Sequence, residues 1–109
     1  MQPAGIELRT EPRVPVSFPG TLSIDGRSTP CLIQNMCTRG FLIKADAALP
    51  VGHCVHLRCE LYPHQSIECK VQVRHVNHQC LGAKVVEIGD DEKRLCLQFL
   101  EEQRSRMAA

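Results

Sequence analysis

The sequence lacks net charge, long apolar runs and paired-cysteine motifs. Its 13 Lys and Arg residues nearly balance 12 Asp and Glu residues, which leaves a formal charge of +1. This balance argues against DNA as a partner, because extended binding to nucleic acid relies on bulk positive potential. No apolar stretch approaches the ~20 residues needed to cross a bilayer, so we expect no membrane insertion. The opening residues carry Pro3 and Glu7 without an apolar run, so we expect no signal peptide.

Cysteine is unusually frequent for a chain of this length. Seven cysteines occur among 109 residues, an odd number with no C-x-x-C pair, which does not suit a disulfide framework. Cys59 and Cys69 fall on the apolar positions of strand-like segments, where a thiol packs as a small hydrophobic group. We therefore expect reduced cysteines in a cytoplasmic protein.

The histidines and cysteines do not have the spacing of a metal site. On one extended strand His53 and Cys59 would share a face but lie about 20 Å apart, too far for one ion with bonds of ~2 Å. We predict no metal site. Because G-x-S-x-G, H-E-x-x-H and phosphate-loop motifs are absent, we also predict that the protein is not an enzyme. A Cys–His nucleophile pair, or a metal-binding or redox domain, stays open as an alternative.

The length indicates one domain, and apolar alternation predicts six short strands within it. Asp25-Gly26 favours a hairpin turn between the first two strands, and Pro19-Gly20 should interrupt the first. Short strands joined by turn residues are typical of an antiparallel sandwich or a small barrel. The predicted strands cover approximately residues 14–24, 28–35, 41–45, 55–61, 67–74 and 81–88.

After the last strand the apolar spacing becomes helical. One apolar stripe predicts a C-terminal helix that packs against the strands; it comprises Leu95, Cys96, Phe99 and Leu100. Asp90 is the expected N-cap of this helix. Acidic residues follow at its start and Arg106 lies near its end, as the helix dipole favours.

Two arginines, Arg9 and Arg13, stand four positions apart in a proline-containing N-terminal arm, residues 1–13. Pro12 and its neighbours disfavour helix there, and four residues of extended chain reach about 13 Å. Guanidinium groups at this separation suit a small dianionic ligand with planar faces. Ordinary solvated surface charges are the alternative. Residues 14–109 are expected to form the folded body of the same domain.

A second polar cluster follows the second predicted strand, in the segment Asn35-Met36-Cys37-Thr38-Arg39-Gly40. The Asn35 amide is both a donor and an acceptor. Arg39 is either a third contact to the anionic ligand or an exposed charge. Gly40 provides either a special backbone conformation or a close approach that a side chain would block. Plain turn residues remain an alternative explanation of the cluster.

The two clusters, in this order and inside this strand pattern, resemble the PilZ domain family. That family carries the signatures R-x-x-x-R and D/N-x-S-x-x-G, matched here by Arg9 to Arg13 and by Asn35 to Gly40. The later segments Val-Gln-Val-Arg and Leu-Gly-Ala-Lys-Val are similar too. The resemblance implies a mainly β protein, a six-stranded antiparallel barrel with a C-terminal α-helix. It also implies a receptor for the bacterial second messenger cyclic di-GMP that signals to a partner protein.

The resemblance assigns ligand binding to six residues and implies no further cofactor. They are Arg9, Arg13, Asn35, Cys37, Arg39 and Gly40. One of them departs from the family pattern, because Cys37 stands where the signature has serine, and a thiol is a weak donor and acceptor. Losing one neutral hydrogen bond costs about 0.5–1.5 kcal/mol. The chain is therefore expected to be either a weakened receptor or a PilZ-like interaction module that no longer binds nucleotide.

Overall fold

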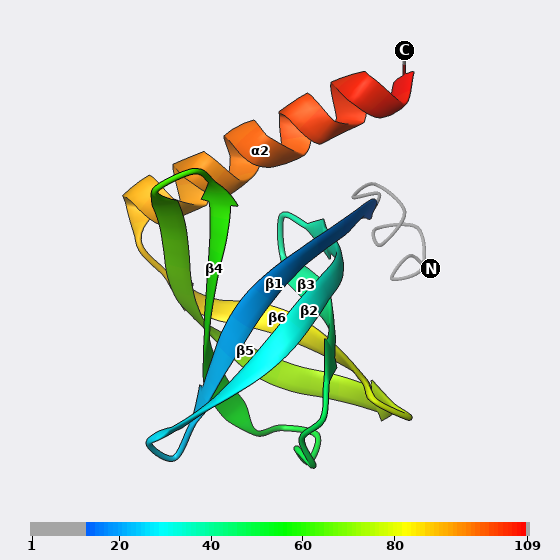
Figure 1. The fold of residues 1–109 in the computed structure, drawn as a ribbon, viewed down its shortest axis with the longest axis vertical. Helices are drawn as coiled ribbons and strands as arrows, with labels where there is room; N and C mark the ends of the chain where they lie inside the picture. Colours follow the sequence, from blue (N-terminus) through cyan, green and yellow to red (C-terminus); the bar gives the residue numbers. More distant parts are fainter. Residues whose placement is uncertain (1–12, 109) are drawn as a thin grey trace, which may run out of the picture.

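The computed structural model describes residues 13–108. Six antiparallel strands close into a barrel, and one helix lies across an end of it (Figure 1). The six predicted strands and the final helix are confirmed, and the barrel is the correct alternative to the sandwich. The elements are β1 (Val14–Ile24), β2 (Arg27–Cys37), β3 (Gly40–Ala45), β4 (Cys54–Tyr62), β5 (Gln65–Asn77), β6 (Cys80–Ile88) and α2 (Asp90–Ala108).

Around the barrel the strands follow the order β1-β2-β3-β6-β5-β4. Four of the contacts are hairpins, and the predicted turn at Asp25-Gly26 is confirmed, with positive φ at both residues. The remaining two contacts are long-range. β3 pairs with β6, and β1 pairs with β4, which closes the barrel. Closure leaves none of the six described strands with an unpaired edge.

Two predictions about strand limits are wrong. Pro19 and Gly20 do not interrupt β1, since both pair with β2, and the irregularity lies earlier, between Pro15 and Phe18. Pro19 is tolerated because pairing with β4 starts only at Gly20, so no bond to that strand is lost. β5 extends beyond residue 74, to Asn77. The extension was missed because a register shift between Val73 and His75 leaves the last residues exposed and breaks their alternation.

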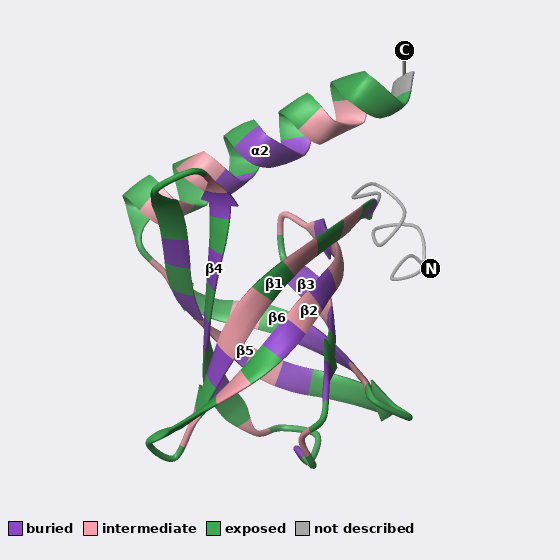
Figure 2. Cartoon of the chain, viewed as in Figure 1, coloured by how far each residue is buried: buried purple, intermediate pink, exposed green. Residues whose placement is uncertain are grey.

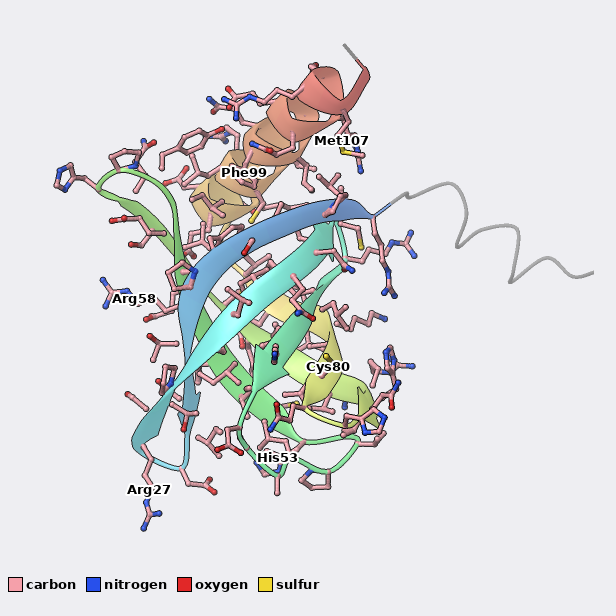
Figure 3. The ribbon with its side chains drawn as sticks, turned by 45° about the vertical axis from the view of Figure 1, so that its right-hand side comes forward. Arg27, His53, Arg58, Cys80, Phe99 and Met107 are labelled. Carbon is pink, nitrogen blue, oxygen red and sulfur yellow. The ribbon has the colours of Figure 1, made fainter. Side chains whose placement is uncertain are left out.

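Alternate residues of every strand fill the barrel interior (Figure 2). Cys59 and Cys69 are buried among them, as predicted. The apolar stripe of α2 closes one end, where the Phe99 ring meets the rings of Phe18 and Tyr62 edge-on, each at 5.7 Å between centroids (Figure 3). Among the described residues, those with no exposed surface are Leu22, Ile33, Ile43, Leu57, Ile67, Val71 and Leu100.

The helix α2 begins one residue away from its predicted cap. The N–H of Lys93 donates to the carbonyl oxygen of Gly89 at 2.9 Å, so Gly89 is the N-cap and Asp90 is already helical. A Cβ at residue 89 would lie 2.9 Å from a Glu92 carboxylate oxygen. The glycine therefore leaves room for Glu92, whose other oxygen accepts the N–H of Glu68 at 2.7 Å. This bond ties the start of α2 to β5.

The C-terminal half of α2 is held by a second polar contact. The Tyr62 hydroxyl donates to a carboxylate oxygen of Glu102 at 2.6 Å. No helix within residues 13–108 has the length and apolar character required to span a membrane.

The buried thiols make the barrel sensitive to alkaline pH. Burial raises the pKa of Cys59 and of Cys69 to about 12, from an ordinary value of 9.0. These groups fold as neutral thiols, so the stability they contribute is complete below pH 9 and is lost as the pH rises toward 12. We expect the melting temperature to fall steeply above about pH 9. Circular dichroism melts across this range test the expectation.

A Cys59→Ala variant provides the control, because one of the buried thiolates can no longer form. Its melting temperature, although lower at neutral pH, should decline less between pH 9 and pH 11. An equal decline in variant and parent would show that other groups cause the alkaline loss.

Candidate functional site

The start of β1 brings Arg13 to the second polar cluster. In the β1–β2 pairing Val14 lies opposite Met36, so Arg13, one residue earlier, lies beside Cys37. The side chains of Val14 and Met36 are both buried in the core. Because strand residues alternate between faces, Arg13 and Cys37 belong to the outer face. Arg13 is exposed, and this part of the barrel lies at the same end as α2 (Figure 1).

The turn between β2 and β3 is fixed to a third strand. Thr38 and Arg39 form this turn, and Cys37 pairs with Gly40 on either side of it. The carbonyl oxygen of Arg39 accepts the N–H of Val85 at 2.8 Å. The backbone of the cluster is therefore held by β6 as well as by its own hairpin.

Gly40 allows the backbones of β3 and β6 to approach closely. Its φ is not in the positive region, which within the described residues includes only Gly26 and Gly52 among the glycines. A Cβ at residue 40 would overlap the carbonyl oxygen of Ala83 on β6. Of the two explanations predicted for Gly40, the structure supports the close approach.

Two rows of residues run from the cluster across the outer surface. The first connects Cys37, Gly40, Lys84 and Gln72, and the second connects Asn35, Leu42, Gly82 and His75. The imidazole of His75 lies over Gly82, because a Cβ there would overlap the ring. These rows place Lys84 and His75 next to the predicted motif.

The six predicted site residues fall into two groups. Arg13, Asn35, Cys37, Arg39 and Gly40 gather at one end of the barrel, on the start of β1 and on the β2–β3 hairpin. Arg9 lies outside the described residues. Lys84 and His75 have no predicted role from the sequence, although Lys84 belongs to the segment Leu-Gly-Ala-Lys-Val that resembles the family. Only the long-range pairing of β6 with β3 places that segment beside the motif.

The histidines and cysteines are distributed widely. Within residues 13–108, no three His, Cys, Asp or Glu side chains are grouped so that they could hold a metal ion. Cys59 lies inside the barrel, while His53 precedes β4 and is partly exposed. Cys80 lies on the surface, where its thiol donates to the Gln34 amide oxygen at 3.5 Å (Figure 3).

An open depression follows the exposed face of α2 and is separate from the motif. Its volume is about 770 Å³, and only α2 residues between Arg94 and Arg106 line it. Because no strand contributes a wall, we regard it as a furrow between neighbouring helix side chains rather than as a ligand site.

Comparisons with known proteins agree with this arrangement. The family model described as "PilZ domain" matches residues 7–102. None of the curated proteins searched matches the chain. A similar solved structure is that of the Bacillus subtilis inhibitor of motility (MotI/DgrA), with a TM-score of 0.77 and 16% sequence identity. The match covers 90% of this chain and 51% of that one, so this chain spans about half the length of that protein.

The likeness to the motility inhibitor shows the fold, and the family model covers most of the sequence, including both arginine-containing motifs. The closed six-stranded barrel with its C-terminal helix is the architecture that the resemblance implied. The chain belongs to the PilZ domain family, a family of the cyclic di-GMP receptor type.

Proposed function

We propose that the protein is a regulatory receptor that binds cyclic di-GMP on the barrel surface and relays the signal to a partner protein in the cytoplasm. The observation that carries this proposal is the position of Arg13 beside the Asn35–Gly40 cluster. Arg13 is the last residue of the first family motif, and it lies beside the second motif. Residues 1–13 form the arm in this proposal, and Arg9 contributes its second arginine.

The chemistry of these residues suits both parts of the ligand. A guanidinium pairs bidentately with phosphate oxygens and with guanine O6 and N7, and its flat face stacks on a purine. The Asn35 amide offers a donor and an acceptor to a guanine edge. Gly40 keeps the β2–β3 turn close to β6, which holds the turn in place before ligand arrives.

The partner is proposed to act in the control of motility, biofilm or exopolysaccharide. Support comes from the similar solved structure, whose name describes an inhibitor of motility. A relay through protein contacts also agrees with the regulatory character of PilZ domains, which are not enzymes.

Calorimetric titration of the reduced protein with cyclic di-GMP tests the proposal, with GTP as the control nucleotide. We expect saturable binding in the micromolar range or tighter for cyclic di-GMP and none for GTP. Absence of binding at high ligand concentration would contradict the receptor proposal and favour the second candidate.

The second candidate is an interaction module that has lost nucleotide binding, and Cys37 is the observation that favours it. A Cys37→Ser variant separates the candidates, because a hydroxyl restores a hydrogen bond worth about 0.5–1.5 kcal/mol. For a receptor, we expect calorimetry to show affinity raised up to about tenfold. Cys80→Ser, a second partly exposed thiol outside the motif, serves as the control and should leave affinity unchanged. An unchanged affinity in Cys37→Ser would show that this side chain does not contact the ligand.

A further inference from the structure

Lys84 lies on the far side of the motif glycine from Cys37. The backbone pairing sets Cys37 opposite Gly40 on β3, and Gly40 opposite Lys84 on β6. A Cβ at residue 40 would lie 3.4 Å from the Cα of Lys84, so these two strands approach closely. The bond from the Val85 N–H to the Arg39 carbonyl oxygen fixes Lys84 relative to the turn. The position of Lys84 is therefore set by the same contacts that shape the motif.

Gly40 contributes no side chain between Lys84 and Cys37, and its backbone is buried against the carbonyl oxygen of Ala83. Arg13, Cys37, Gly40 and Lys84 follow one another across four neighbouring strands, each about 4.8 Å from the next. Arg13 and Lys84 therefore stand on opposite sides of Cys37 and Gly40. Both have long, flexible side chains that can lean over the glycine from either side.

The charge of Lys84 is not neutralised by the protein. Its side chain is exposed, and within residues 13–108 it has no ion-pair partner. The neighbouring outward positions on the same three strands are neutral or basic: Gly82 and Val86 on β6, Leu42 on β3, and Gln72 and Arg74 on β5. Gln72 donates its amide to the Gly52 carbonyl oxygen at 3.3 Å, away from the motif. A phosphate above Gly40 would meet positive charge from both sides.

From this arrangement we infer that Lys84 is a further ligand-binding residue, which contacts a phosphate of the dinucleotide opposite Arg13. The inference rests on the proposed function, since it names an additional contact within the same site. It also gives the chain a charge-assisted contact beside the weakly bonding thiol of Cys37.

The experiment is a calorimetric titration of cyclic di-GMP into four proteins: the wild type, Lys84→Met, Lys84→Arg and Lys44→Met. Lys44 is the matched control, because it is an exposed lysine on the outer face of β3, four residues along the strand from Gly40. That separation is about 13 Å, beyond the reach of a ligand contact at the motif.

We expect Lys84→Met to weaken binding about tenfold or more, as the loss of a charge-assisted hydrogen bond predicts. Lys84→Arg, which keeps the charge, should retain most of the affinity, and Lys44→Met should equal the wild type. Binding by Lys84→Met should also depend less on salt concentration than binding by Lys44→Met. Thermal melts establish that each variant folds.

The outcomes distinguish a failure of the Lys84 inference from a failure of the proposed receptor function. If the wild type binds and Lys84→Met matches Lys44→Met in both affinity and salt dependence, the inference about Lys84 is overturned while the receptor function stands. If the wild type itself does not bind, the proposed function fails and the inference with it. If Lys84→Arg binds as poorly as Lys84→Met, the contact is not electrostatic and the inference is overturned.

Discussion

Replacing Arg13 with alanine should weaken cyclic di-GMP binding by about tenfold to a hundredfold. A hydrogen bond to a charged group is worth about 1.5–3 kcal/mol, and each 1.4 kcal/mol corresponds to about tenfold in affinity. Arg13 is the described arginine that the β1–β2 register sets beside Cys37, and within residues 13–108 it has no ion-pair partner. In the proposed function its guanidinium contacts a ligand phosphate or guanine. Calorimetric titration of the variant measures the effect.

Arg27→Ala is the matched control for this variant. Arg27 is also exposed and also lies at a β1–β2 terminus, but at the hairpin tip, remote from α2 and the motif (Figure 3). Removing either arginine changes the net charge equally, so any general electrostatic effect appears in both variants. Equal affinities of the Arg13 and Arg27 variants would remove Arg13 from the site.

Gly40→Ala should produce the second large effect, a loss of stability. The added Cβ would overlap the backbone carbonyl oxygen of Ala83, an atom that cannot move without shifting β6. Overpacking of this kind costs typically 1–3 kcal/mol and sometimes more, and we expect about 3 kcal/mol here because backbone is the obstacle. For a domain of roughly 100 residues this lowers the melting temperature by about 10–20 °C. A thermal melt followed by circular dichroism provides the measurement.

Gly82→Ala is the control for Gly40→Ala. It tests whether the overlap with the Ala83 carbonyl oxygen, rather than the replacement of a strand glycine as such, causes the loss of stability. Gly82 lies on the neighbouring strand, and the atoms that a Cβ would meet there belong to the His75 ring. An exposed imidazole can rotate away, so we expect a loss of less than about 1 kcal/mol. Similar melting temperatures for the two variants would contradict the assignment of Gly40 to a close backbone approach.

Local patterns in the sequence predicted the elements of this fold but not how they are arranged. Alternation marks the strands because the interior and exterior of the barrel differ in polarity, and Asp25-Gly26 marks a hairpin because both residues take positive φ. The pairing of β3 with β6 and of β1 with β4 has no local signal, since it depends on contacts distant in sequence. The family resemblance predicted that the six strands close into a barrel, but it did not predict which strands pair.

The candidate site was likewise predicted only where its residues are close in sequence. The motif residues Asn35 and Gly40 were found because they are close in sequence and recur in a known pattern. Lys84 was not assigned a role, because nothing around it in the sequence distinguishes it from an ordinary outward strand residue such as Lys44. The side chain of Asp90 predicts it as the helix cap, whereas Gly89 is the cap in the structure and leaves room for Glu92.

The pairing of β3 with β6 also determines at which stage of folding the site is formed. Gly40 and Lys84 are paired residues that lie more than forty positions apart in the chain, and contacts of such separation form late because a long loop must first close. In the proposed function, a partly folded chain presents no complete binding surface, and only the native barrel would be stabilised by the ligand. At a hundred times its dissociation constant, the messenger would stabilise the whole domain by about 2.7 kcal/mol. A rise in messenger concentration would then protect the receptor from degradation, so that signal level and receptor lifetime increase together.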